Sequence, residues 1–262
     1  MANLIRSARP ASEWTTNELA AYNIVIQTED TSTFLGASIE NLPLPQVDPV
    51  ILNVEGRPPA GVSKSTRPFF RYLRGAMVHP LGGDGVESAA AHFASHLLGL
   101  LDYDEPDRVI HQRLQIRFLV SGVYADAQPD VCVLDDEDFL PLVQENKRLT
   151  PPDDLEPQLI AQAIAAFYEN NRRRKSIGRP ALPLQEFAGI TLTGTAPIFY
   201  KIPITQELLF AINTGQYPAQ QTVVHRFIPP VPDPNSFFDQ GMQTLENRRV
   251  VLKCYEAFKQ FV

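Results

Sequence analysis

The sequence contains little of what defines several common protein classes. It has two cysteines, Cys132 and Cys254, in 262 residues, too few for a disulfide framework or a zinc cluster. Cys132 lies in an apolar stretch and is expected to be a small buried side chain. No apolar run reaches the length of about eighteen residues that a membrane span requires, so we expect no membrane association. The Gly-rich phosphate loops of Walker-type and dinucleotide-binding enzymes are absent, which argues against a cofactor enzyme of those kinds.

The sequence also lacks the excess of basic residues that is typical of nucleic-acid-binding proteins. Its 23 Lys and Arg against 30 Asp and Glu give a net charge of −7. A basic face offset by acidic loops is compatible with that total. The N-terminus has no apolar secretory core, which predicts an intracellular protein of the cytoplasm or nucleus. Two arginines and no acidic residue among the first nine positions leave a mitochondrial location open.

The composition is that of a soluble globular protein, with 44% hydrophobic and 20% charged residues. We expect residues 1–84 to form a Pro-rich extension packed on a core domain of residues 85–262. Thr15 predicts a capped helix ending near Tyr22, and residues 23–27 predict a strand. Repeated prolines predict irregular, extended pieces over the rest of this extension, lying on the core domain or on a partner subunit.

The core domain is predicted to alternate helices and strands. Residues 112–121 alternate apolar and polar side chains and predict a half-buried strand, followed by a turn over 122–128. The complete prediction has helices over 86–101, 153–175, 205–214 and 242–261 and strands over 112–121, 128–134, 142–148, 189–195, 198–202 and 222–228. We therefore expect an α/β (α+β) fold with a mixed central sheet flanked by helices.

Two of these strands carry charged residues that suit metal chemistry. Asp130 begins one strand, and Glu145 and Lys147 lie two residues apart on the next, so they point to the same face. The spacing from Asp130 to Glu145 (145 − 130 = 15) accommodates a strand, an acidic turn and a return strand. Paired carboxylates bind hard cations such as Mg²⁺ or Mn²⁺. A lysine beside the metal orients an attacking water and stabilises charge on a phosphate.

Pro129-Asp130 followed by Glu145-x-Lys147 resembles the signature of the PD-(D/E)XK nuclease superfamily, over roughly residues 85–230. The resemblance implies a restriction-endonuclease-like core and Mg²⁺-dependent hydrolysis of nucleic acid. It implies that Asp130, Glu145 and the Asn146 carbonyl hold the metal and that Lys147 positions the water. Glu87, on the helix before the core strands, is the matching further acidic ligand. Many enzymes of this fold form dimers, so the resemblance also implies a homodimer.

Other residues of the following helix are candidates for contact with substrate. The resemblance to exonuclease-type members points to a functional glutamine on this helix. Gln158 and Gln162 lie near the same face, and we take Gln158 as the substrate contact. Arg172, Arg173, Arg174 and Lys175 form a basic cluster at the helix end. Such a cluster can bind a phosphate backbone, or it can simply interact favourably with the negative end of the helix dipole. The whole chain also resembles a group of basidiomycete fungal proteins, in stretches that here are Leu142–Arg148, Pro157–Phe167 and Pro197–Pro203.

Two alternatives remain open at this point. In the first, Asp130 merely begins a strand, and Glu145 and Lys147 form an exposed pair on an edge strand. In the second, the chain has the nuclease fold but serves as a binding or scaffold protein, which its acidic charge and Pro-rich extension suit. A basic face over the Asp130–Glu145 cleft, with measurable metal binding, would favour the enzyme.

Overall fold

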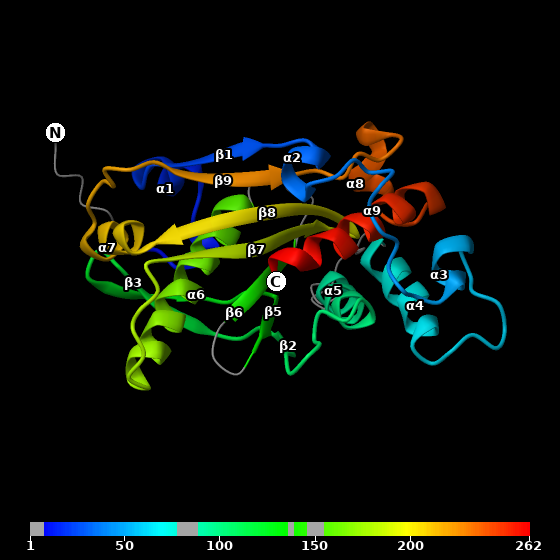
Figure 1. Cartoon of the computed structure of the whole chain (residues 1–262), viewed down its shortest axis with the longest axis horizontal. Coiled ribbons are helices and arrows are strands. Elements are labelled where there is room, and N and C mark those ends of the chain that lie inside the picture. Colours follow the sequence, from blue (N-terminus) through cyan, green and yellow to red (C-terminus); the bar gives the residue numbers. More distant parts are fainter. Residues whose placement is uncertain (1–7, 78–88, 136–138, 146–154) are drawn as a thin grey trace.

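The protein is built on a mixed sheet of seven strands (Figure 1). The structure, a computed structural model, describes residues 8–77, 89–135, 139–145 (backbone only) and 155–262. From one edge to the other the strands are β1 (Ile24–Thr28), β9 (Thr222–Phe227), β8 (Ala196–Thr205), β7 (Leu184–Thr193), β6 (Phe139–Glu145), β5 (Val131–Leu134) and β2 (Val109–Gln112). Two neighbouring pairs, β1–β9 and β6–β7, are parallel, and the other pairs are antiparallel.

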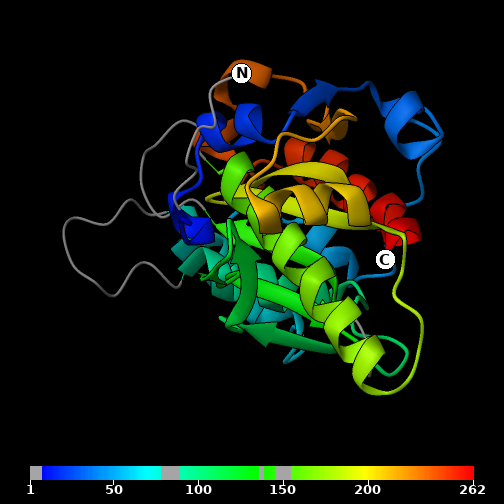
Figure 2. The same cartoon turned by 90° about the vertical axis from the view of Figure 1, so that its left-hand side faces the viewer.

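Helices cover both faces of this sheet, as the sequence predicts. One face packs against α2 (Thr31–Leu35), α3 (Pro49–Asn53), α4 (Thr66–Met77), α5 (Ala89–Leu100) and α9 (Leu245–Phe258). The other packs against α1 (Thr16–Ala21), α6 (Glu156–Ser176), α7 (Gln206–Thr214) and a hairpin of β3 (Ile116–Val120) and β4 (Val123–Ala127). Figure 2 shows α6 crossing the near side of the molecule with α7 beside it. Short helical turns complete the chain: η1 (Ala11–Glu13), η3 (Pro234–Ser236), α8 (Phe237–Gln240) and η4 (Lys259–Phe261).

Local signals in the sequence correctly predict several helix ends. Thr15 caps α1 in a capping box with Glu18. Thr205 caps α7, accepting a hydrogen bond from the Leu208 amide, and Gly215 ends that helix in the left-handed conformation. The buried stripe predicted for α6 is also confirmed, since Leu159, Ile160, Ala163, Ala166 and Phe167 are all fully buried.

The prediction of one strand over 112–121 and a turn over 122–128 is wrong. The chain breaks at Arg113, which has a positive φ of 54°, so that β2 lies in the large sheet and β3 lies outside it. β3 instead pairs with β4 through a two-residue turn at Ser121 and Gly122, both with positive φ. Such turns match the twist of a hairpin. The alternation of apolar residues identifies β3 as a strand but carries no information about its partner.

The N-terminal region is more regular than its prolines predict. β1 pairs in parallel with β9 and is an edge strand of the central sheet. Pro49 lies in the first turn of α3 after the cap residue Asp48, and Pro68 lies in the first turn of α4. Proline is tolerated there because the first amides of a helix have no partner within it. Both prolines therefore lie at the start of helices in segments for which extended structure was predicted.

Arg248 ties the N-terminal helices to α9. Its side chain is fully buried and donates to four backbone carbonyls, those of Met242, Gln243, Ile51 and Val54, at 2.8–2.9 Å. Its guanidinium also lies over the rings of Phe69 and Phe70, at 5.8 and 5.6 Å from their centroids. Burial lowers the pKa of Arg248 to about 10.

Candidate functional site

The two strands that carry the predicted carboxylates are neighbours, and the relevant ends meet. β5 and β6 are antiparallel, and Val131 pairs with Val143. Asp130 directly precedes β5 and Glu145 is the last residue of β6, so both backbones lie at the same end of the sheet. β6 then pairs in parallel with β7, with Glu145 opposite Leu192, and α6 is the connection between them.

Asp130 is the predicted metal ligand whose side chain the structure describes. It is buried, with 3% of its surface exposed, and its backbone carbonyl accepts a hydrogen bond from the Arg113 amide at 3.1 Å. For Glu145 the description covers the backbone alone, and Glu87, Asn146 and Lys147 lie outside the described residues. The gathering of these side chains around one cation therefore stays a prediction.

A glutamine from α6 reaches the segment that precedes Asp130. Gln162 is 3% exposed, and its side-chain amide donates to the Gln128 carbonyl at 3.4 Å. The predicted substrate contact, Gln158, lies one helical turn earlier and is half-buried. The spacing of four residues puts both glutamines on one side of α6. The same spacing makes Gln162 the alternative to Gln158 in the sequence, and the structure adds its contact with the Gln128 carbonyl.

A polar network adjoins this end of the sheet beneath the first turn of α6. The Glu156 carboxylate accepts hydrogen bonds from the Tyr200 hydroxyl and the Arg226 guanidinium, both at 2.9 Å. Thr191 lies 3.2 Å from the Tyr200 hydroxyl, and Arg226 also donates to the Thr28 hydroxyl. Thr191, in turn, pairs with Gln144 of β6. The network therefore fixes the start of α6 next to the end of β6.

The network is buried and nearly neutral as a whole. Glu156 is 5% exposed and Tyr200 is fully buried, while the Arg226 side chain is 26% exposed. Burial raises the pKa of Tyr200 well above its ordinary value, and the adjacent Glu156 charge adds to that shift. Tyr200 is therefore a hydrogen-bond donor to Glu156 across the accessible pH range. Sequence analysis identified none of these residues.

The predicted basic cluster lies at the C-terminal end of α6, but it is not simply exposed charge. One carboxylate, Glu169, pairs with Arg172 through two contacts of 2.7 Å and with Arg173 at 3.1 Å. Arg174 donates to the Pro180 carbonyl at 3.1 Å, and Lys175 is exposed. Two of these four cations are thus partly neutralised by the helix itself. Their contact with substrate stays a prediction.

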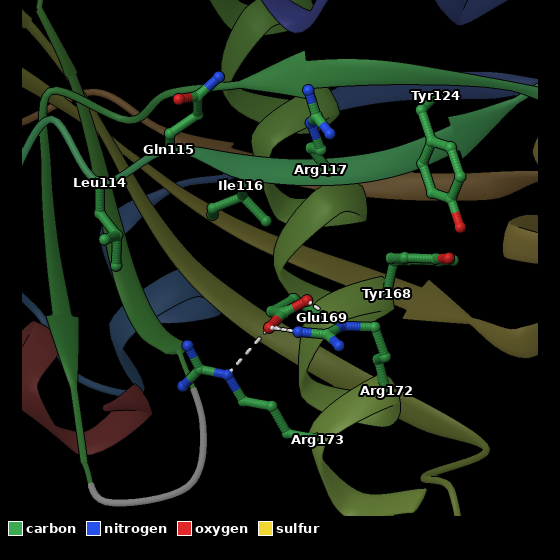
Figure 3. Close-up of a pocket in the computed structure, with 9 residues that line it drawn as sticks. All are labelled: Leu114, Gln115, Ile116, Arg117, Tyr124, Tyr168, Glu169, Arg172 and Arg173. Atoms are coloured by element: carbon green, nitrogen blue, oxygen red, sulfur yellow. Dashed lines mark hydrogen bonds and ion pairs between the residues drawn. The ribbon is translucent and has the colours of Figure 1, made fainter. Parts of the chain in front are cut away.

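An open pocket of about 390 Å³ lies between this part of α6 and the β3–β4 hairpin (Figure 3). Leu114, Gln115, Ile116, Arg117, Tyr124, Tyr168, Glu169, Arg172 and Arg173 line it. Figure 3 shows Tyr124 extending from the hairpin toward Tyr168 of α6. The nearby Tyr124 hydroxyl, together with burial, raises the pKa of Tyr168 to about 12. Tyr168 is therefore neutral at physiological pH.

Among the described residues, no three His, Cys, Asp or Glu side chains gather closely enough to hold a metal ion. The side chains of Glu87 and Glu145 are not among those described residues. Within the same described part of the chain, no helix combines the length and apolarity needed to cross a bilayer.

Comparison with known proteins adds no family to this description. No protein-family model matches the chain, and the search of curated proteins likewise finds no match.

Proposed function

We propose that this protein is a metal-dependent phosphodiesterase that cleaves nucleic acid at the corner formed by Asp130 and Glu145. One observation carries the proposal, namely the order and pairing of the elements around that corner. After α5 comes β2, then the β3–β4 hairpin outside the large sheet, then β5 and β6. β2 is antiparallel to β5 and β5 is antiparallel to β6, and α6 then leads to β7, which is parallel to β6. Apart from that hairpin, the order is a helix, three strands, a helix and a further strand, which is the order that the PD-(D/E)XK resemblance implies.

The residues at the corner fit a hard cation. Asp130 supplies a buried carboxylate at the start of β5, and the backbone of Glu145 lies at the adjacent end of β6. Asp130, Glu145 and the Asn146 carbonyl would hold Mg²⁺ or Mn²⁺, and Glu87 would complete the ligand set. The bound ion supplies an activated water and offsets charge on the phosphate. Lys147 would orient that water and stabilise the developing negative charge.

The surroundings of the corner support this assignment. The Glu156–Arg226–Tyr200 network fixes the first turn of α6, so the chain entering that helix has a defined end point beside β6. Gln162 contacts the carbonyl of Gln128, two residues before Asp130. The corner is thus built on hydrogen-bonded elements, as a site with fixed geometry requires.

The first test is calorimetric titration of the protein with Mg²⁺ and with Mn²⁺. We expect the parent to bind and both Asp130→Asn and Glu145→Gln to lose binding, because each removes a charged oxygen ligand. Asp126→Asn is the matched control, since this exposed carboxylate of β4 pairs with Arg117 and is no part of the corner. Metal binding that survives both corner substitutions would contradict the site.

Cleavage is tested separately with labelled DNA and RNA substrates, single-stranded and duplex. Lys147→Ala is expected to abolish cleavage with little change in the far-UV circular dichroism, because it removes chemistry and no core packing. Lys64→Ala removes an exposed lysine elsewhere and should cut like the parent. A Lys147→Ala variant that cuts normally, or that fails to fold, would show that Lys147 is misassigned.

A binding or scaffold protein of the same fold is the second candidate. The net charge of −7 favours it, since phosphate substrates are repelled by an acidic surface. In that case the protein would bind a partner other than nucleic acid, and all the substrates above would stay intact in the presence of Mn²⁺.

A further inference from the structure

The pocket between α6 and the β3–β4 hairpin is not explained by the catalytic corner. It combines two tyrosines, Tyr124 and Tyr168, with three arginines and one carboxylate. Aromatic rings and arginines together are the groups on which proteins stack bases and bind phosphates. An acidic peptide would use the arginines but has no use for a stacking surface.

The pocket keeps a positive charge after its internal ion pairs are formed. Glu169 is shared by Arg172 and Arg173, which leaves one positive charge in excess. Arg172 uses its Nε and one terminal nitrogen for Glu169, and its side chain is 64% exposed. A guanidinium carries five N–H donors, so the other terminal nitrogen of Arg172 is available to a phosphate.

Tyr124 provides the apolar surface. It is 64% exposed, so its ring is accessible to a ligand. Figure 3 shows the ring of Tyr124 beside the pocket with its hydroxyl toward Tyr168. A tyrosine side chain has two torsion angles, so its ring stacks on a base with little loss of side-chain entropy.

The pocket also lies near the proposed catalytic corner. Leu114 and Gln115 directly follow Arg113, whose amide donates to the Asp130 carbonyl. Along α6, Gln162 and Glu169 are seven residues apart (169 − 162 = 7), about 10 Å at the rise of an α-helix. A strand of nucleic acid that occupies the pocket is therefore within a few nucleotides of the corner.

We propose that this pocket holds an unpaired base and the adjacent phosphate of a single-stranded nucleic acid. The base stacks on Tyr124, and Arg172 binds the phosphate. The substrate is single-stranded because in a duplex the base faces are covered by their neighbours, so an aromatic side chain cannot stack on them. This inference rests on the proposed function and names its substrate class.

The test measures binding of the full-length protein to a labelled oligothymidylate of about 12 nucleotides by fluorescence anisotropy. EDTA is present so that cleavage does not interfere. Tyr124→Ala is expected to weaken binding roughly 5- to 100-fold, the range for loss of one stacked base. Tyr124→Phe keeps the ring and should stay close to the parent. Tyr217→Ala is the matched control, since this tyrosine is 58% exposed and does not line the pocket.

Arg172→Ala tests the phosphate contact. It should weaken binding and lower the slope of log Kd against log salt by about 0.7, the value for one phosphate on a single strand. Arg57→Ala removes the same charge from another exposed position and should leave the slope unchanged.

Several outcomes would overturn the inference: equal affinity for a duplex of the same sequence, equal affinity for an oligoglutamate peptide, no binding of the oligonucleotide, or no effect of Tyr124→Ala. Equal affinity for free thymidine monophosphate would also overturn it, since it would identify a nucleotide site.

The proposed catalytic function is tested independently of all these binding measurements. If the Tyr124 and Arg172 variants bind more weakly but the parent protein cleaves no substrate, the pocket is supported and the nuclease activity is refuted. If the parent cleaves nucleic acid but Tyr124→Ala binds it normally, the nuclease activity is supported and the pocket is refuted.

Discussion

The Glu156–Arg226 ion pair gives the sharpest prediction about stability. Arg226→Met removes the guanidinium and leaves Glu156, 5% exposed, with the Tyr200 hydroxyl as its remaining described donor. Removing one partner of a buried ion pair costs about 3–5 kcal/mol. Because the Arg226 side chain is 26% exposed, water replaces part of the lost interaction. We therefore expect the free energy of unfolding to fall by about 2–3 kcal/mol.

Replacing the other partner should cost less. Glu156→Gln keeps an oxygen acceptor for the Tyr200 hydroxyl and removes the charge, so we expect a loss of about 1 kcal/mol. In the double variant neither charge is left unpaired. The decrease in unfolding free energy of the double variant should therefore be smaller, by about 1–2 kcal/mol, than the sum of the decreases of the two single variants, as is typical of residues in direct contact.

Urea unfolding of the four proteins in this cycle measures all these values. Arg117→Met serves as the control, because Arg117 and Asp126 are 71% and 51% exposed and their pair should contribute less than about 1 kcal/mol. Additive effects, within about 0.3 kcal/mol, would refute the reasoning. So would an Arg226→Met variant that is no less stable than the Arg117→Met control.

Three further predictions concern single sites. Arg248→Leu should lower the free energy of unfolding by about 4 kcal/mol or more in the same urea assay, because four backbone carbonyls, two buried and two part-buried, lose their donor. A loss under about 1 kcal/mol would contradict this. Cys132 and Cys254 are buried, and burial raises the pKa of each thiol to about 12. An aromatic disulfide reagent should therefore label these thiols only as the protein unfolds. Fast labelling of the native protein would argue against their burial. Hydrogen bonds from the Val50 amide and the Thr66 hydroxyl lower the pKa of Asp48 in the folded state. The Asp48 carboxylate therefore contributes to the free energy of unfolding above its unfolded-state pKa, and this contribution is lost as the pH falls through its folded-state pKa. The difference in unfolding free energy between the parent and Asp48→Asn should therefore disappear in acid. A difference that is independent of pH would refute this.

Sequence reasoning identified local structure where the signal lies within a few residues. The helix α7 illustrates this, since the Thr205 cap bonds an amide three residues on and Gly215 supplies the left-handed end. The apolar stripe of α6 is likewise set by a helical repeat. The order of Asp130 and Glu145 along the chain also follows from the sequence, and the structure adds that the two strands carrying them are adjacent.

The errors concern which strands pair with each other. The β3 pattern was recognised as a strand, yet its pairing with β4 depends on the turn at Ser121 and Gly122. Asp126 and two alanines weaken the strand signal that Val123 and Tyr124 give to β4. The same limit applies to β1, whose place beside β9 brings together segments almost two hundred residues apart.

The sequence by itself determined which segments form most of the helices and strands, where several of them end, and in which order the candidate catalytic residues occur. These features depend on propensities, caps and periodicities that act over a few residues. The tertiary structure decided which strands are neighbours, and with them the polar network and the tyrosine–arginine pocket. In the network, the hydrogen bonds of Glu156 and Arg226 join residues 44, 70 and 198 positions apart. Such contacts form only after the whole sheet has brought their elements together, so no short stretch of sequence encodes them.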